Sequence, residues 1–222
     1  PADTPWAACI HLVRKPAGSY RLCLADRARN KRRTPPEYPV GDRRVLETYW
    51  LNAIWYGSTD LTKGCWQVGI AAKSRDYHGV WTPIGVFRFN RLVMGDHSAC
   101  QYFTKQIRAA LKDVENREPA GLVVYVDDQG HYAQCDKHLL GASQEEKELN
   151  AAWNMLWHYI GNKSKGIKGF FETCYEKKLF LSPKKLQLMR RSIKFLGDLV
   201  SADGISIHPE RVQAVRDMPR PT

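Results

Sequence analysis

Hydrophobic and polar residues alternate along several short stretches of the chain, and this two-residue period is typical of strands with one buried face. The strands predicted in this way lie within 9–25, 55–61, 79–93, 121–134, 193–200 and 204–207. Turns are expected at Pro16 to Gly18, around Pro83 and at Asp203-Gly204, which is a strong hairpin signal. The pattern therefore predicts several hairpins.

Other stretches place apolar residues three or four positions apart, which is the period of an amphipathic helix. Residues 98–114 show this period at Phe103, Ile107, Ala110 and Leu111. Further helices are expected at 43–53, 143–160, 169–178 and 209–218. Because strands and helices mix without a regular βαβ alternation, the pattern predicts an α+β fold.

Local signals support two of these helices. Ser143 and Glu146 match a capping box at the start of helix 143–160, and Pro209 suits the first position of the last helix. We expect the apolar residues of helix 143–160 to pack in the core rather than to stack on nucleic-acid bases. These residues are Trp153, Leu156, Trp157 and Ile160.

The composition is that of a globular protein with a strong positive charge. The 222 residues include 34 Lys and Arg against 23 Asp and Glu, which gives a net charge of +11. This excess favours a polyanionic partner such as a nucleic acid. No apolar run reaches the roughly 18 residues that a membrane helix needs, so we expect no membrane-spanning segment.

The cysteines and histidines give little sign of a structural metal. Six cysteines are spread along the chain without a C-x-x-C pair, so we expect mostly reduced core residues of an intracellular protein. His131, Cys135 and His138 lie close in sequence, but a fourth ligand is missing and the spacing matches no standard zinc module.

Adjacent carboxylates follow an apolar strand at Asp127-Asp128. Like charges side by side repel each other, and a divalent cation relieves that repulsion. The two side chains can act together only if a tight turn breaks the strand alternation, and we expect Gly130 to supply it. Asp60, at the end of another strand, would complete a magnesium site with hard oxygen ligands. The alternative is that Asp127-Asp128 only caps a hairpin.

The residues around these carboxylates resemble a known family. The matching segments are 5–23, 27–39, 60–67 (motif A), 82–89, 125–128 (motif C), 182–185 (motif D), 195–197 (motif E) and the tail 195–222. In this order they are similar to the reverse transcriptase of Ty3/gypsy-type LTR retrotransposons. The resemblance covers nearly the whole chain apart from an apparent insertion.

This resemblance implies a right-hand polymerase fold with fingers and palm, an antiparallel palm sheet and no thumb. Residues 1–54 would form part of the fingers. Residues 55–207 would form the palm, with fingers residues at 78–95 and an insertion at about 139–168. Residues 208–222 would begin the thumb or connection.

The resemblance also implies roles for individual residues. Two Mg²⁺ ions would be held by Asp60, Asp127 and Asp128, and Lys185 would protonate the pyrophosphate. The residues implied in nucleotide binding are Lys15, Arg21, Cys65 and Gly95. The primer grip would consist of Phe195, Leu196 and Gly197.

The sequence departs from the family pattern at several of these positions. Motif B, at 92–104, lacks both prolines and the closing glutamine, and Asp96 adds an acid beside the expected place of template and nucleotide. Cys65 replaces the aromatic residue that would exclude a 2′-hydroxyl. Gln129-Gly130-His131 replaces an apolar return strand, so we expect that hairpin to pack less well.

Three functional hypotheses follow. The first is an RNA-directed DNA polymerase domain that binds RNA or an RNA/DNA duplex and carries out two-metal nucleotidyl transfer. The second is a domesticated, catalytically inactive subunit with a structural or RNA-binding role in a larger, ribosome-like ribonucleoprotein. The third is a retained fold that binds protein subunits, with Trp153 and Trp157 facing the partner if they are not buried.

Overall fold

The computed structural model describes residues 2–15, 18–34, 38, 48–50 and 52–218. The chain divides into two compact units, one of Pro1–Val40 with Lys63–Ile107 and one of Gly41–Thr62 with Arg108–Thr222. The assignment of chain segments to fingers, palm and thumb stays a prediction.

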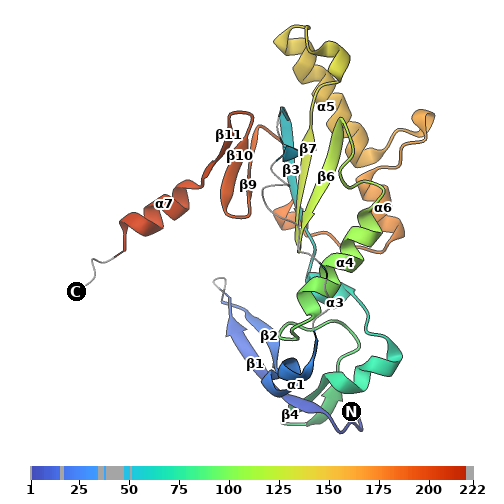
Figure 1. The fold of residues 1–222 in the computed structure, drawn as a ribbon, viewed down its shortest axis with the longest axis vertical. Helices are drawn as coiled ribbons and strands as arrows, with labels where there is room; N and C mark the ends of the chain where they lie inside the picture. Colours follow the sequence, from blue (N-terminus) through green and yellow to red (C-terminus); the bar gives the residue numbers. More distant parts are fainter. Residues whose placement is uncertain (1, 16–17, 35–37, 39–47, 51, 219–222) are drawn as a thin grey trace. The chain divides into compact units, whose positions relative to one another are not determined.

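The first unit is built on a four-stranded sheet in the order β2-β1-β4-β5 (Figure 1). The strands are β1 (Ala7–Arg14), β2 (Tyr20–Ala25), β4 (Gly79–Thr82) and β5 (Gly85–Arg88). The helices are α1 (Arg27–Arg32), α3 (Gly64–Gln67), the 3-10 helix η1 (Ala72–His78) and α4 (Ala99–Leu111), which continues into the second unit. Strand β1 pairs antiparallel with β2 and parallel with β4.

The second unit contains an antiparallel sheet in the order β6-β7-β3-β8 and a smaller sheet in the order β11-β10-β9. The strands of the larger sheet are β3 (Trp55–Asp60), β6 (Ala120–Tyr125), β7 (Asp128–Ala133) and β8 (Gln187–Arg190). Those of the smaller sheet are β9 (Ser192–Phe195), β10 (Asp198–Ser201) and β11 (Gly204–Ile207).

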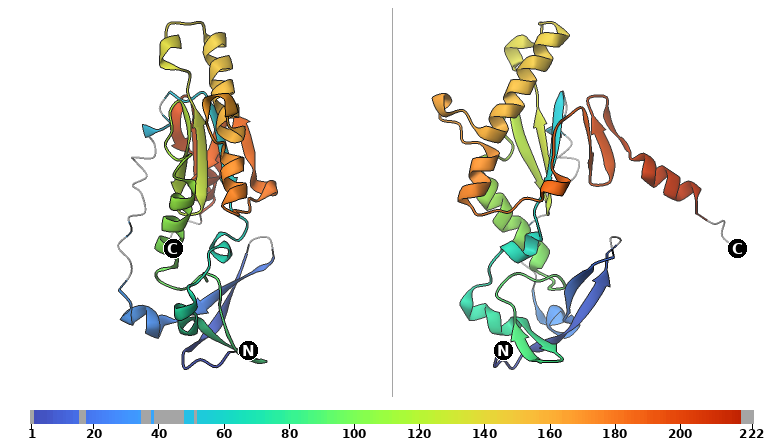
Figure 2. Two further views of the ribbon diagram at one scale, coloured as in Figure 1. Left: turned by 90° about the vertical axis from the view of Figure 1, so that its right-hand side faces the viewer. Right: turned by 180° about the vertical axis from the view of Figure 1, so that it is seen from behind.

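Helices cover one side of the larger sheet, and the smaller sheet lies on the other (Figures 1 and 2). Helix α5 (Gln144–Ile160) contacts β3, β6 and β7 and packs beside α6 (Phe170–Glu176). The remaining helices are α7 (Pro209–Arg216) and the 3-10 helices η2 (Lys137–Leu139), η3 (Lys163–Lys165) and η4 (Pro183–Lys185). The helices of the described residues include no candidate for a membrane-spanning segment, since none combines the necessary length with the necessary hydrophobicity.

Aromatic residues fill the space between the two sheets of the second unit. The ring centroids of Trp50 and Phe195 lie 4.8 Å apart, with the rings edge to face, and Tyr56 and Tyr132 belong to the same buried cluster. Gly130 leaves room for this packing, because a Cβ there would lie 2.8 Å from Trp50 Cζ2 and 3.0 Å from Phe195 Cε2.

The α+β fold class with antiparallel sheets is confirmed, and most predicted elements form. The helix predicted at 43–53 lies mostly outside the described residues. The single strand predicted at 193–200 is wrong. Leu196 and Gly197 adopt the left-handed conformation, with φ of 50° and 86°, and form a tight turn that separates β9 from β10.

The predicted core face of helix α5 is wrong. The helix packs on the sheet through Ala151, Met155, His158 and Tyr159, while Trp153 and Ile160 are exposed. The buried residues lie on the side of the helix opposite to the predicted face, so Trp153 and Ile160 point outward, while Leu156 and Trp157 are half-buried.

The expectation of buried cysteines holds only for Cys174, since Cys9 and Cys100 are exposed. Within the part of the chain that the structure describes, no three His, Cys, Asp or Glu side chains are grouped to hold a metal ion. His131 of the zinc candidate is fully buried, where its Nδ1 is hydrogen-bonded to His158 instead.

Candidate active site

Asp60 and Asp128 lie directly opposite each other where strands β3 and β7 meet. Asp60 is the last residue of β3, and Asp128 is the first residue of β7. Directly paired residues of antiparallel strands project from the same face of the sheet, with Cβ atoms about 4.5–5.5 Å apart. Two of the predicted carboxylates, 68 positions apart in the sequence, are therefore brought together.

Asp127 joins this edge through a two-residue turn. Tyr125 pairs with Asp128, so Val126 and Asp127 alone connect β6 to β7. Val126 has a φ of 57°, which is an outlier for a β-branched residue and costs on the order of 1–3 kcal/mol. The prediction that Gly130 supplies the turn is wrong, because Gly130 lies inside β7 and pairs with Val123 and Ser58.

Burial and like charges act together on Asp128. Burial raises the pKa of Asp128 above its usual value, and the charges of Asp127 and Asp60 raise it further. The ammonium group of Lys185 lowers the pKa of Asp128 in return. Burial and the two neighbouring carboxylates disfavour the ionised form of Asp128, so a cation at this edge of the sheet would stabilise that form.

Lys185 lies beside Asp60, with its Nζ 3.1 Å from Asp60 Oδ2. The segment that carries it is fixed to the end of β3, because Ser182 donates its backbone N–H to the carbonyl of Asp60 at 2.8 Å. The Lys185 side chain is largely exposed, so this ion pair adds little stability. The structure thus places the motif D lysine next to a motif A carboxylate.

The donor chemistry of these residues suits Mg²⁺, which prefers hard carboxylate oxygens and retains several waters. Asp60, Asp127 and Asp128 are the residues that would hold it. Over the described residues, however, three such groups do not converge closely enough to form a metal cluster. Lys185 neutralises Asp60 in this arrangement.

A buried polar network lies on the opposite face of the same strands. Thr59 donates its hydroxyl to Gln129 Oε1 at 2.7 Å, and its Oγ1 lies 3.0 Å from His131 Nε2. His131 Nδ1 lies 2.8 Å from His158 Nε2 on α5. Thr59 precedes Asp60 and Gln129 follows Asp128, so the network adjoins both carboxylates in the chain.

Both imidazoles of this network are neutral. Burial lowers the pKa of His158 to about 3, with a smaller contribution from the charge of Arg117. Burial, and then the neighbouring His158, lower the pKa of His131 well below its usual value. Because Thr59 gives its proton to Gln129, His131 donates from Nε2 to Thr59 and accepts at Nδ1 from His158.

The expected loose packing of the return strand is not found. Gln129 and His131 are fully buried and hydrogen-bonded. This packing has a cost, because Gln129 Nε2 and His158 Nδ1 find no hydrogen-bond partner among the described residues. Sequence reasoning missed this network, because its members come from three separate elements.

The three residues predicted as a primer grip differ in exposure. Phe195 is buried against Trp50, whereas Leu196 and Gly197 form the turn between β9 and β10. Arg211 of α7 packs against this turn, since a Cβ added at Gly197 would lie 3.0 Å from the guanidinium carbon of Arg211. Leu196 and Gly197, and not the Phe195 ring, are therefore the parts that a primer could contact.

The residues predicted to bind the nucleotide lie in the first unit. The backbone N–H of Lys15 donates to Ser19, Arg21 is exposed on β2, and Cys65 is half-buried in α3. Gly95 has a φ of 99°, and a Cβ there would lie 2.1 Å from the carbonyl oxygen of Leu24. Only glycine fits at position 95, whereas nucleotide binding by these residues stays a prediction.

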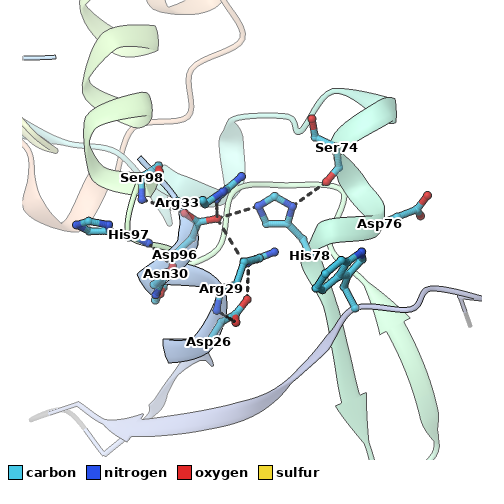
Figure 3. Close-up of polar contacts among 12 residues, drawn as sticks. Asp26, Arg29, Asn30, Arg33, Ser74, Asp76, His78, Asp96, His97 and Ser98 are labelled. Atoms are coloured by element: carbon cyan, nitrogen blue, oxygen red, sulfur yellow. Dashed lines mark hydrogen bonds and ion pairs between the residues drawn. The ribbon is translucent and has the colours of Figure 1, made fainter. Parts of the chain in front are cut away.

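Asp96 is buried in the first unit and is held by several donors (Figure 3). Its Oδ2 lies 2.9 Å from His78 Nε2, 2.5 Å from Arg33 Nη1 and 3.6 Å from Arg29 Nη2. Its Oδ1 accepts the backbone N–H of Ser98 at 2.9 Å. The charge of Asp96 is thus matched within the protein, whereas its expected place beside template and nucleotide stays a prediction.

Burial alone would raise the pKa of Asp96, but the hydrogen bonds from His78 and Ser98 and the charge of Arg33 outweigh it. Together they hold the pKa of Asp96 well below its usual range. Asp96 is ionised and ties the altered motif B segment to α1 and η1. The sequence did not reveal this role, because Arg33 and His78 are distant along the chain.

Sequence comparison relates the chain to retroelement polyproteins. It is 26% identical over 229 residues to the "Retrovirus-related Pol polyprotein from transposon opus" of Drosophila melanogaster, covering 100% of this chain and 20% of the relative. It is 25% identical over 201 residues to the corresponding protein of transposon gypsy, covering 90% and 17%. The chain thus spans about a fifth of these relatives. No protein-family model matches it.

Structure comparison identifies the fold. A foamy viral protease-reverse transcriptase in complex with double-stranded DNA superposes with a TM-score of 0.75 and 21% identity, over 99% of this chain and 34% of that one. The same viral protein in complex with an RNA/DNA hybrid gives a TM-score of 0.74 and 21% identity, over 99% and 26%. The chain therefore has a reverse transcriptase fold, and its resemblance to the reverse transcriptase region of gypsy-type LTR retrotransposons is confirmed.

Proposed function

We propose that the chain is an RNA-directed DNA polymerase domain of retroelement origin and that Asp60, Asp127 and Asp128 are its catalytic carboxylates. The observation that carries this proposal is the pairing of Asp60 with Asp128, with Asp127 in the adjoining turn. A hairpin cap alone would not require a carboxylate on the neighbouring strand.

The side chains of this protein would have separate roles in nucleotidyl transfer. Asp60, Asp127 and Asp128 would hold two Mg²⁺ ions, whose chemistry when bound would be activation of the primer hydroxyl and stabilisation of the leaving pyrophosphate. Lys185 carries a proton at Nζ beside Asp60 and gives it to the pyrophosphate as the bond to the α-phosphorus breaks. Lys15 and Arg21 contact the triphosphate, and the Leu196-Gly197 turn supports the primer end.

The partner that suits this function is RNA or an RNA/DNA duplex. The net charge of +11 favours a polyanion, and the similar foamy viral protein is found with both double-stranded DNA and an RNA/DNA hybrid. Because the chain spans only a fifth of its polyprotein relatives, no other activity of those proteins is carried over.

A second candidate function is a domesticated, inactive subunit that binds RNA or protein in a larger ribonucleoprotein. It is supported by the altered motif B, in which Asp96 is buried in a salt-bridge cluster, and by the Lys185–Asp60 ion pair. This candidate predicts salt-sensitive RNA binding without synthesis, because neutralised phosphates release counterions.

Primer extension on an RNA template with Mg²⁺ separates the two candidates. The polymerase extends the primer, and Asp127→Asn abolishes extension while RNA binding persists. Asp203→Asn is the matched control, because Asp203 is exposed in the turn between β10 and β11. RNA binding without extension under any metal would support the inactive subunit instead.

A further inference from the structure

Helix α5 has two apolar faces, and only one of them packs against other residues that the structure describes. Ala151, Met155 and His158 are buried against the sheet. On the opposite side, Leu149, Trp153 and Ile160 are 61%, 50% and 55% exposed. An amphipathic helix of a monomer normally carries polar residues there. The exposed face is therefore suited to contact another protein surface.

The spacing of the apolar residues on this side is that of a coiled-coil seam. The exposed Leu149, Trp153 and Ile160 and the half-buried Leu156 follow one another, in the order 149, 153, 156, 160, at intervals of four, three and four residues. This is the alternation of a and d positions in a heptad. Trp157 stacks on Trp153, with ring centroids 5.8 Å apart, and broadens the apolar surface. The partner surface is therefore best matched by another helix.

Opposite charges lie at the two ends of this seam. Glu145 and Glu146 are exposed in the first turn of α5, and Lys163 and Lys165 are exposed in η3 just after the helix. Figure 1 shows the loop that carries η3, coloured orange, projecting away from the sheet. The surface is thus acidic at one end, apolar in the middle and basic at the other end.

We propose that this face of α5 binds the same face of a second copy of the chain in antiparallel orientation. Such a twofold pairing places Leu149 against Ile160 and Trp153 against Leu156 of the other copy. It also brings the acidic first turn of α5 of each copy to the end of the seam that is followed by η3, with Lys163 and Lys165, in the other copy. The surface is therefore complementary to itself, as a twofold interface requires.

The charges decide against two other arrangements. A parallel pairing would place the glutamates of one copy against those of the other, and like charges across an interface are unfavourable. RNA would meet the acidic first turn of α5 along the same face, which repels phosphate. The second copy is thus the occupant that satisfies both the apolar seam and its charged ends.

Sedimentation equilibrium of the 222-residue chain tests the proposal. We expect a concentration-dependent dimer, which Trp153→Glu and, independently, Leu149→Lys convert to monomer. Both side chains are exposed, so circular dichroism should show unchanged folding. Tyr175→Glu is the matched control: Tyr175 is exposed but lies on α6 and not on α5, so its replacement should leave the dimer intact.

A charge variant tests the antiparallel orientation. Lys163→Glu with Lys165→Glu makes both ends acidic, so we expect at least a tenfold weaker dimer at low salt and a smaller loss at 1 M salt, where charges are screened. Lys177→Glu with Lys178→Glu makes the same charge change at the end of α6 and leaves the dimer constant unchanged.

Three outcomes would overturn the proposal. A monomer at all concentrations excludes the second copy. A dimer that survives both Trp153→Glu and Leu149→Lys places the interface elsewhere. If Trp153→Glu weakens RNA binding without changing the mass, the face binds nucleic acid instead.

Discussion

Nε2 of His158 on α5 lies 2.8 Å from Nδ1 of His131 on β7, in the fully buried network behind the candidate carboxylates. The neutral imidazole of His158 donates to that of His131, and protonation of His131 at Nδ1 would remove the acceptor of this bond. The polar return strand is thus stabilised by a histidine from a helix that follows it in the chain.

This histidine pair predicts a loss of stability in mild acid. The pKa of both rings is lowered in the folded chain, so the unfolded chain binds protons first as the pH falls below about 6.5. The free energy of unfolding should therefore fall by up to about 1.4 kcal/mol per pH unit for each ring between pH 6.5 and 4.

Urea unfolding at a series of pH values measures this dependence. Replacing both His131 and His158 by Gln should flatten it over the same interval, whereas His138→Gln, at an exposed position, should leave the slope unchanged. An equally steep slope in the double variant would mean that other groups cause the acid sensitivity.

Gly130→Ala should destabilise the second unit by about 1–3 kcal/mol, because its Cβ would overlap the Trp50 and Phe195 rings. Thermal or chemical unfolding measures the change. Gly141→Ala is the control, since a Cβ there has no atom of the described residues within 4 Å, apart from its own chain neighbours. Equal effects of the two substitutions would contradict the packing described for Gly130.

Asp96→Asn should destabilise the chain by about 1.5–3 kcal/mol, since it removes the charged partner of Arg33 and His78. Arg33 is a third exposed and thus partly screened, so a larger loss is not expected. Because the pKa of Asp96 is lowered on folding, this stability is present above pH 4 and declines as the pH falls further.

Unfolding of Asp96→Asn at pH 7 measures that loss. The matched control is Asp76→Asn, which breaks the exposed ion pair with Arg88 and should cost less than about 1 kcal/mol. A fully stable Asp96→Asn variant would show that the cluster in Figure 3 contributes no stability.

Lys185→Ala should lower the rate of nucleotide addition by about 10²–10⁴, the usual contribution of a general acid, with little change in folding stability. Lys184→Ala, at the exposed neighbouring position, should keep the full rate. Single-turnover kinetics distinguish the two. A rate that is unchanged in Lys185→Ala would remove Lys185 from the proposed chemistry.

The sequence predicted the elements with strong local signals, such as the capping box of Ser143 and Glu146 and the strand that ends at Asp60. Predictions from the sequence were wrong where contacts between residues far apart in the chain determine which side chains are buried. The period of helix α5 does not tell which of two apolar faces meets the sheet, and Trp153 was assigned to the wrong one.

In the candidate site, too, local motifs were predicted correctly and tertiary contacts were missed. The carboxylates were identified from a motif and their mutual repulsion, whereas the polar support behind them depends on His158 and Thr59, which no local pattern connects. The turn at Val126 was also misplaced, because a β-branched residue at positive φ is contrary to its own preference. Gly130 was needed for close packing and not for a turn.

The central claim is that Asp60, Asp127 and Asp128 act together in nucleotidyl transfer. A Mg²⁺ titration of single-nucleotide incorporation into an RNA-templated primer tests it most directly. The account predicts saturable, Mg²⁺-dependent incorporation that Asp60→Asn and Asp128→Asn each reduce by several orders of magnitude. Incorporation that is equally fast in either variant, or absent from the unaltered chain at every Mg²⁺ concentration, would contradict it.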